Sequence, residues 1–289
     1  MSKNIVLDGM VYRGVSTIEF PTEDGGTARM IETDSVPSGS VTITENGTHD
    51  VTGYAEAVVN VEAESGGSVG GYDINGLINR SQPSGDLVHT DPSATSFKPY
   101  AFSGCTGITS FESEHITTAD TNVFSMCTGL KRVSLPKMTA LKQNFFYNCS
   151  ALESVNLPAV ANINAATVFQ QCASLKSISL PSANTATGMT IFQSCTALEF
   201  ADLGFVTSVN AYLFDKCSAL KTIVLRNTAL VSLANVSAFN KTPFASGGTG
   251  GSIYVPSTLI DTYKSATNWS TIDGYGTITW VALEGSEYE

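Results

Sequence analysis

One short pattern, Phe-x-x-Cys-x-x-(Leu/Ile), recurs six times between residues 102 and 220. Successive cysteines of the pattern are 22, 22, 23, 23 and 22 residues apart, at Cys105, Cys127, Cys149, Cys172, Cys195 and Cys217. So regular a period indicates stacked repeats, in which each unit buries its apolar side against its neighbours. The chain is therefore expected to contain a solenoid.

Each copy of the pattern leads into a segment of the form Leu-x-x-Val-x-Leu, often closed by proline, as in LKRVSLP from Leu130. The alternation places Val133 on one face and Ser134 on the other, which is typical of a strand with one buried face. Proline cannot donate to a ladder and is expected to end each strand at a corner. A second apolar pair, such as Met138 and Leu141, predicts a short strand on the opposite wall. The Phe-x-x-Cys segment would be a turn or a single helical turn.

The cysteines all occupy one position of the repeat. They could form disulfides or a metal site, or they could be a column of buried free thiols that fill the same niche in successive coils. Equivalent positions would lie about 4.8 Å apart, but parallel side chains suit disulfide geometry poorly. Metal-type Cys-x-x-Cys spacing is absent from the sequence. The thiol column is the preferred prediction, and neither a metal site nor a cofactor is expected.

The repeat resembles the BspA-like type of leucine-rich repeat, known from surface and host-interaction proteins of bacteria and some protists. The resemblance is close from Ala101 to about Leu225 and weakens afterwards, where the cysteine is missing. It implies a mainly β leucine-rich-repeat solenoid over residues 72–289. Residues 72–100 would form its N-terminal cap, and a short helix over residues 257–272 its C-terminal cap.

Two small β modules are expected ahead of the solenoid, over residues 1–35 and 36–63, followed by a Gly/Ser linker at residues 64–71. The first module carries hairpin signals at Asp8-Gly9 and at residues 24–26. The second has predicted strands at residues 41–44 and 58–61 and a turn at Asn46-Gly47. Modules this small are expected to depend on packing against each other or against other copies of the chain.

Both modules are similar to segments of phage and prophage virion proteins of Firmicutes. The similar segments are IVLDGMVYRGVSTIEFPTEDGGTARM from Ile5 and GSVTITENGTHDVTGYAEAVVNV from Gly39. The resemblance implies a tail-fibre or receptor-binding virion protein, assembled in the host cytoplasm and displayed on the tail or capsid exterior. The N-terminal modules would attach it to other virion proteins, and a homo-oligomer is implied, with a trimer favoured. Two alternatives are a capsid decoration, head fibre or tail spacer without a receptor role, and a bacterial cell-surface adhesin.

Charge and hydropathy argue against several classes of partner. The formal net charge is −11, and the 15 basic residues do not cluster, which disfavours nucleic acid and anionic membranes. No segment approaches the roughly 20 apolar residues of a membrane span. The opening residues lack the continuous apolar segment of a secretory signal peptide. We expect neither membrane insertion nor ordinary secretion.

Catalytic motifs are also absent from the sequence, including Gly-x-Ser-x-Gly, His-Glu-x-x-His and the phosphate-binding loop. A metal or general-base role is conceivable for Glu112, Glu114 and His115, but a solvated turn is the preferred interpretation. Carboxylate pairs for glycoside cleavage meet only in space and stay open. The chain is expected not to be an enzyme.

The outward side of the predicted main strands is the remaining candidate site. Its candidate binding ladder consists of Arg132, Ser134, Ser154, Asn156, Ser177, Ser179, Phe200, Asp202 and Thr222. These residues are mostly small and polar, and Phe200 is the one aromatic candidate among them. Such a face suits a host-surface glycan or protein or a sister subunit, or it is merely solvated.

Overall fold

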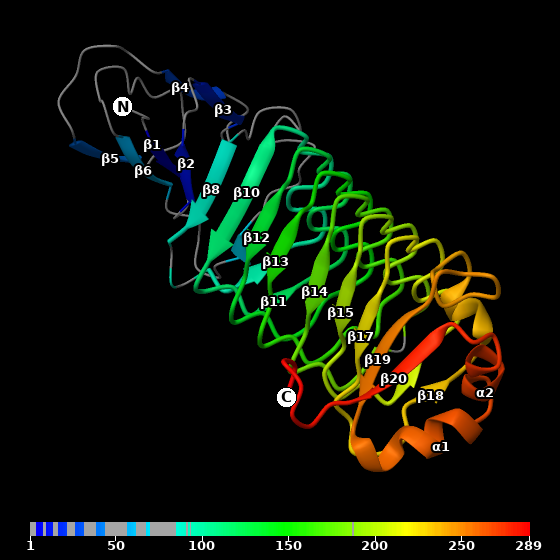
Figure 1. Ribbon diagram of the computed structural model, residues 1–289. Helices are drawn as coiled ribbons and strands as arrows, with labels where there is room; N and C mark the ends of the chain where they lie inside the picture. The colour runs from blue at the N-terminus through cyan, green and yellow to red at the C-terminus, as the bar shows by residue number, and fades with distance from the viewer. Residues whose placement is uncertain are drawn as a thin grey trace.

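The computed structural model describes residues 85–289 apart from Asp91, Ser93 and Thr187, together with the backbone of seven short strands before residue 85. Figure 1 shows the described chain wound into a row of stacked coils with parallel strands along one side. The two α-helices of the described chain are short and lie between residues 260 and 273. The predicted mainly β solenoid is confirmed.

One strand from each coil contributes to a wall that we call the main sheet. Its strands are β8 (Gly85–His89), β10 (Ile108–Ser113), β12 (Arg132–Ser134), β13 (Ser154–Asn156), β14 (Ser177–Ser179), β15 (Phe200–Asp202), β17 (Thr222–Val224), β19 (Gly251–Val255) and β20 (Ile278–Ala282). Neighbours run parallel in two hydrogen-bonded ladders, from β8 to β13 and from β14 to β20. Equivalent residues face each other, so Val133 lies between Phe111 and Val155. This register keeps one side chain set in the core and the alternate set outside.

The opposite wall holds the predicted second strands, which are very short. At its ends β9 (Ser96–Phe97) pairs with β11 (Thr118–Ala119), and β16 (Ser208–Val209) pairs with β18 (Ser232–Leu233), both in parallel. In the middle coils the strand shrinks to single bridges that join Asn162 to Ala140 and Thr185. The second wall is therefore confirmed, with most of its length too short to form a regular strand.

The Phe-x-x-Cys segments are turns and not helical turns. The residue before each cysteine has a positive φ between 55° and 76° in all six copies, for example Met126 and Asn148. A left-handed residue at this place ends any helical path after one turn. Backbone bonds then run from coil to coil, such as Phe124 N to Phe145 O at 2.9 Å and Met126 N to Tyr147 O at 2.7 Å.

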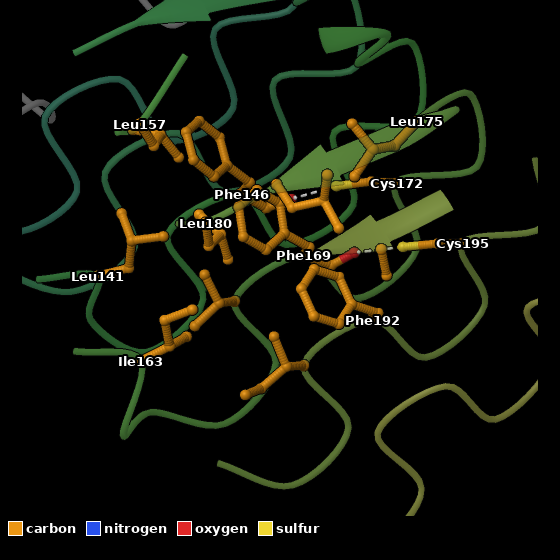
Figure 2. Close-up of a cluster of buried hydrophobic side chains, with 14 of the residues drawn as sticks. Leu141, Phe146, Leu157, Ile163, Phe169, Cys172, Leu175, Leu180, Phe192 and Cys195 are labelled. Carbon is orange, nitrogen blue, oxygen red and sulfur yellow. Dashed lines mark hydrogen bonds between the residues drawn. The ribbon is translucent and has the colours of Figure 1, made fainter. Parts of the chain in front are cut away.

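The phenylalanines of the repeat form a continuous stack through the core (Figure 2). Ring centroids of Phe146, Phe169 and Phe192 follow one another at 5.1 and 5.3 Å with interplanar angles of 20° and 13°. Phe239, from the 3-10 helix η1 (Val236–Phe239), extends the stack beyond Phe214 at 5.9 Å. Phe239 does not belong to the Phe-x-x-Cys pattern, because its coil lacks the cysteine that sets the register.

The cysteines form the predicted column: all six are buried and free. Each thiol after the first also donates a hydrogen bond to the phenylalanine carbonyl of the preceding coil. Cys172 reaches the Phe146 oxygen at 3.2 Å and Cys195 the Phe169 oxygen at 3.0 Å, as Figure 2 shows. Burial raises the pKa of the Cys127, Cys149, Cys172 and Cys217 thiols. The thiol is thus both a core filler and a polar link between coils.

The predicted helix over residues 257–272 is interrupted. It consists of the 3-10 turn η2 (Ser257–Leu259), α1 (Ile260–Ser265) and α2 (Trp269–Asp273), with a break at Asn268, whose φ is 64°. The break turns two side chains onto the free edge of β18. Asn268 Nδ2 donates to the Leu233 oxygen at 2.7 Å, and Trp269 Nε1 donates to the Val231 oxygen at 2.7 Å. The segment closes the last coil, as predicted for a cap.

The N-terminal end differs from the prediction in one respect. Residues 72–100 were expected to form a cap, but from residue 85 onward they supply a further coil, with β8 in the main sheet and β9 in the second wall. The remaining residues of the predicted cap lie outside the described part of the chain. The repeat motif is absent from this coil, which is why the sequence did not reveal it.

Seven strands are described before residue 85. They are β1 (Asn4–Leu7), β2 (Met10–Arg13), β3 (Thr17–Pro21), β4 (Thr27–Ile31), β5 (Gly39–Ile43), β6 (Ala57–Val61) and β7 (Ser68–Val69). The antiparallel pairs β1–β2 and β3–β4 confirm the two hairpins, whereas β5 and β6 pair in parallel. β2 pairs with β8 in an antiparallel arrangement. β7, which lies inside the predicted linker, pairs with β9 in parallel. The Asn46-Gly47 turn lies outside the described residues, and the division into modules stays a prediction.

Candidate binding face

The register of the main sheet brings the predicted ladder residues together in two columns on its outer side. Arg132 lies beside Ser154, and Ser134 beside Asn156. In the second ladder Phe200 lies between Ser177 and Thr222, and Asp202 lies beside Ser179. The structure divides these columns into an open half on β12–β14 and a covered half on β15, β17 and β19.

The open half is polar and accessible. Arg132, Ser154, Asn156, Ser177 and Ser179 are exposed, and Ser134 is half-buried. Asn156 Nδ2 donates to Ser134 Oγ at 3.0 Å, which restrains the amide. The Arg132 guanidinium is in no ion pair with any residue of the described chain. This half therefore presents short, ordered donors and acceptors at the spacing of adjacent strands, about 4.8 Å.

A row of alternating charges borders the two columns, and the sequence analysis missed it. It consists of the residue after the first leucine of each strand segment: Lys131, Glu153, Lys176, Glu199 and Lys221. All five are exposed, and backbone bonds connect their coils, as from Glu199 N to Lys176 O at 2.8 Å. Opposite charges on adjacent coils avoid repulsion between like charges. The alternation of charge can be found in the sequence by comparing the residue that directly follows the leucine in successive repeats.

Asp202 is not the outward contact residue that was predicted. Its side chain is 4% exposed and forms an ion pair with Arg226, whose Nη2 lies 2.9 Å from Oδ2. Arg226 Nε and the backbone N–H of Gly204 also donate to the carboxylate, at 3.1 and 3.0 Å. These bonds satisfy the charge inside the structure. Arg226 follows the last full repeat, so the repeat pattern gave no sign of this partner.

The covered half contains apolar side chains that lie under the chain that follows β20. Phe200 is half-buried, and its ring centroid is 5.1 Å from that of Tyr288. Tyr288 also meets Tyr254 edge-on at 4.8 Å and 82°. Val224 faces away from the solenoid core yet is fully buried. Phe200, Val224, Tyr254 and Tyr288 thus form a small second cluster on the outer face, which we call the outer cluster.

The group around Glu112, Glu114 and His115 shows structural contacts. The buried His89 Nδ1 lies 2.8 Å from Ser113 Oγ, and the same oxygen accepts from the backbone N–H of His115 at 3.1 Å. The two histidine rings meet edge-on at 6.1 Å. Within the described residues no group of three His, Cys, Asp or Glu side chains could hold a metal ion. None of the described helices is long and apolar enough to cross a membrane.

Comparison with known proteins identifies the family. A family model described as the BspA type leucine-rich repeat region matches six copies, over residues 86–167 and 139–266, which is more than half of the chain. This chain belongs to the BspA-type leucine-rich-repeat family. The BspA-type match begins within β8, one coil before the first Phe-x-x-Cys turn, in agreement with the additional coil found there. No curated protein matches the chain.

Solved structures with the same kind of fold are distant in sequence. The T. pallidum leucine-rich repeat protein is 17% identical with a TM-score of 0.43, over 69% of this chain and 92% of its own. A leucine-rich repeat protein from Bacteroides ovatus is 18% identical with a TM-score of 0.45, over 84% of this chain and 54% of its own. One from Eubacterium ventriosum is 17% identical with a TM-score of 0.48, over 71% of this chain and 64% of its own. The chain thus spans only about half of the B. ovatus protein.

Proposed function

We propose that this BspA-type repeat protein binds a host surface through the open half of its main sheet, as a displayed component of a phage particle. The observation that carries the binding role is the open half itself. Exposed, short polar side chains stand there on three consecutive strands, of which β12 and β13 are in register, with Asn156 held by Ser134. We propose a non-catalytic role without cofactor.

The physical case for binding rests on order and on unused hydrogen-bonding capacity. Serine and asparagine have few rotamers, so little conformational entropy is lost when a partner fixes them. Arg132 adds five donors in a planar fork, which suits carboxylates and polar oxygens of a glycan or a protein. The small side chains between these groups let a partner approach the strands closely.

A cell-binding assay with the full chain tests this proposal. Labelled wild type and a Ser134→Ala/Asn156→Ala variant are titrated onto host cells. We expect the variant to bind about tenfold more weakly or worse, since it loses an ordered polar pair at the centre of the face. Thr139→Ala is the matched control, because Thr139 is exposed on the second wall, and it is expected to bind as wild type. Equal binding by both variants would contradict the assignment of this face.

The virion setting is supported by the two N-terminal segments that are similar to phage virion proteins. In this proposal those segments attach the chain to other virion proteins, and the chain forms a homo-oligomer, with a trimer favoured. Immunogold labelling of purified virions with antibody against residues 100–225 tests the setting. We expect label on the tail or capsid exterior, and particles without label would overturn it.

A bacterial cell-surface adhesin is the second candidate, and membership in the BspA-type family favours it equally. Label on intact bacterial cells, with none on particles, would support the adhesin. A capsid decoration or tail spacer without a receptor role is the third candidate. It would be favoured by labelled particles together with a chain that fails to bind host cells.

A further inference from the structure

The covered half of the outer face is closed by residues 283–289, which we call the strap. After β20 the strap turns back over the main sheet (Figure 1). Its first two residues are anchored by one backbone and one side-chain hydrogen bond: Leu283 N donates to the Val255 oxygen at 2.9 Å, and Ser257 N donates to the Glu284 carboxylate Oε2 at 2.9 Å. Beyond Glu284, the hydrogen bonds among the described residues stay inside the strap, such as that from Tyr288 N to Ser286 Oγ.

The aromatic contacts of the far end of the strap with the sheet come from one ring. Tyr288 contacts Phe200 and Tyr254, and the outward Val224, which pairs with Tyr254 across the sheet, is fully buried. Gly285, between the anchor and the ring, has a φ of 74°, a conformation that glycine adopts without strain. The far end can thus leave the sheet at the expense of the two aromatic contacts of Tyr288, while the anchor and β20 stay in place.

The geometry around the ring indicates what kind of group fits there. Tyr254 meets it edge-on at 82°, the arrangement that aromatic quadrupoles prefer. A sugar ring would need polar groups beside the aromatic faces, but the neighbouring carboxylate of Asp202 is already engaged by Arg226 and Gly204. These observations favour the aromatic side chain of a polypeptide over a glycan.

We propose that Phe200, Val224 and Tyr254 form a docking site for an aromatic side chain of a partner protein, and that Tyr288 occupies this site as an internal competitor. This inference rests on the proposed role of the outer face in binding. The ring that now fills the site is flanked by Glu287 and Glu289, so the site accepts an acidic segment. A partner must displace Tyr288. Its apparent affinity equals the affinity for the open site multiplied by the fraction of chains in which the site is open.

The experiment compares the full chain with its Tyr288→Ala variant. The probe is a fluorescein-labelled synthetic peptide with the sequence of residues 283–289, titrated by fluorescence anisotropy. We expect Tyr288→Ala to bind the peptide about tenfold more tightly than wild type, since burial of one half-exposed aromatic ring is worth about that factor. Tyr275→Ala is the matched control, because Tyr275 is an exposed tyrosine outside the outer cluster, and it should bind as wild type.

Two further arms make the result specific. The double variant Tyr288→Ala/Phe200→Ala should bind the peptide no more tightly than wild type. A peptide with alanine in place of its tyrosine should bind Tyr288→Ala no more tightly than it binds wild type. Equal peptide binding by wild type and Tyr288→Ala, or a gain that survives removal of Phe200, overturns the docking site. Binding of an oligosaccharide such as chitohexaose to Tyr288→Ala, dependent on Phe200 and without peptide binding, overturns the choice of a protein partner. The cell-binding assay depends on Ser134 and Asn156, so either proposal can fail alone.

Discussion

The regular coils and the closing segment stabilise the same stack in two different ways. Between residues 101 and 225 the backbone of each coil forms hydrogen bonds with the backbone of the next. The same phenylalanine and cysteine recur in every coil. On the second wall no strand of the described chain follows β18, and the side chains of Tyr263, Asn268 and Trp269 bind Val231 and Leu233 instead. Stability in the coils is therefore shared among equivalent residues, whereas the end depends on single ones.

Replacement of Trp269 by alanine is expected to have the largest effect. The ring is buried and its Nε1 is the donor for the Val231 oxygen, so the variant gains a cavity and leaves that carbonyl unbonded. We expect a loss of about 5 kcal/mol in the free energy of unfolding, measured by denaturant titration. Tyr275→Ala, an exposed change in the same region, is the control. A loss below about 1 kcal/mol for Trp269→Ala would mean that the end does not depend on it.

Phe169→Ala should cost slightly less, about 4 kcal/mol, because it opens a cavity in the stack without removing a hydrogen bond. Its ring lies between Phe146 and Phe192, so neighbouring rings can close part of the gap. The measurement is the same titration, with Phe205→Ala as the control because Phe205 is 49% exposed. A loss larger than that of Trp269→Ala would reverse the comparison between coils and end.

The buried thiols predict a fall in stability at alkaline pH. Burial raises the pKa of the Cys127, Cys149, Cys172 and Cys217 thiols above the ordinary 9.0 in the folded chain, so at these positions the unfolded chain loses protons first as the pH rises. The contribution of each of these four thiols is complete below pH 9 and declines above it by up to about 1.4 kcal/mol per pH unit. Cys149→Ala should remove one such increment from the slope between pH 9 and 10.5, measured in reductant. An unchanged slope would show that Cys149 is not buried as a thiol.

Tyr263→Phe is expected to have the smallest effect. It keeps the packing and removes only the hydroxyl that accepts from the Val231 N–H at 3.1 Å, which should cost about 1 kcal/mol at pH 7. Burial raises the pKa of Tyr263 to about 12, so its contribution is complete below pH 10 and lost as the pH rises toward 12. The variant should lose stability less steeply over that range. Parallel pH curves for wild type and variant would contradict this.

Much of the solenoid could be predicted because its information is local and repeated. The period fixed the register of the main sheet, and the alternation in LKRVSLP correctly placed Val133 inside and Ser134 outside. The cysteine column followed from one position recurring at that period. What the period could not show was the bond from each thiol to a phenylalanine carbonyl, since that depends on the path of the turn.

The candidate face could be predicted only in part. Its open half lies where the repeat placed it, but Asp202 turned out to be bound by Arg226, 24 residues further along the chain. Phe200 turned out to lie under Tyr288, and the predicted helix to break at Asn268. Arg226, Tyr288 and Asn268 do not occupy positions of the repeat, so the periodicity of the sequence could not predict their contacts.

The sequence by itself determined the repeat, the side of the sheet on which each strand residue lies, and the burial of the cysteines. These properties follow from spacing along the chain, which covalent geometry and burial convert directly into structure. Only the tertiary structure decided how the last coil is closed and which half of the outer face is open. Those outcomes depend on contacts between Trp269 and Val231, and between Tyr288 and Phe200, that arise once the coils are stacked.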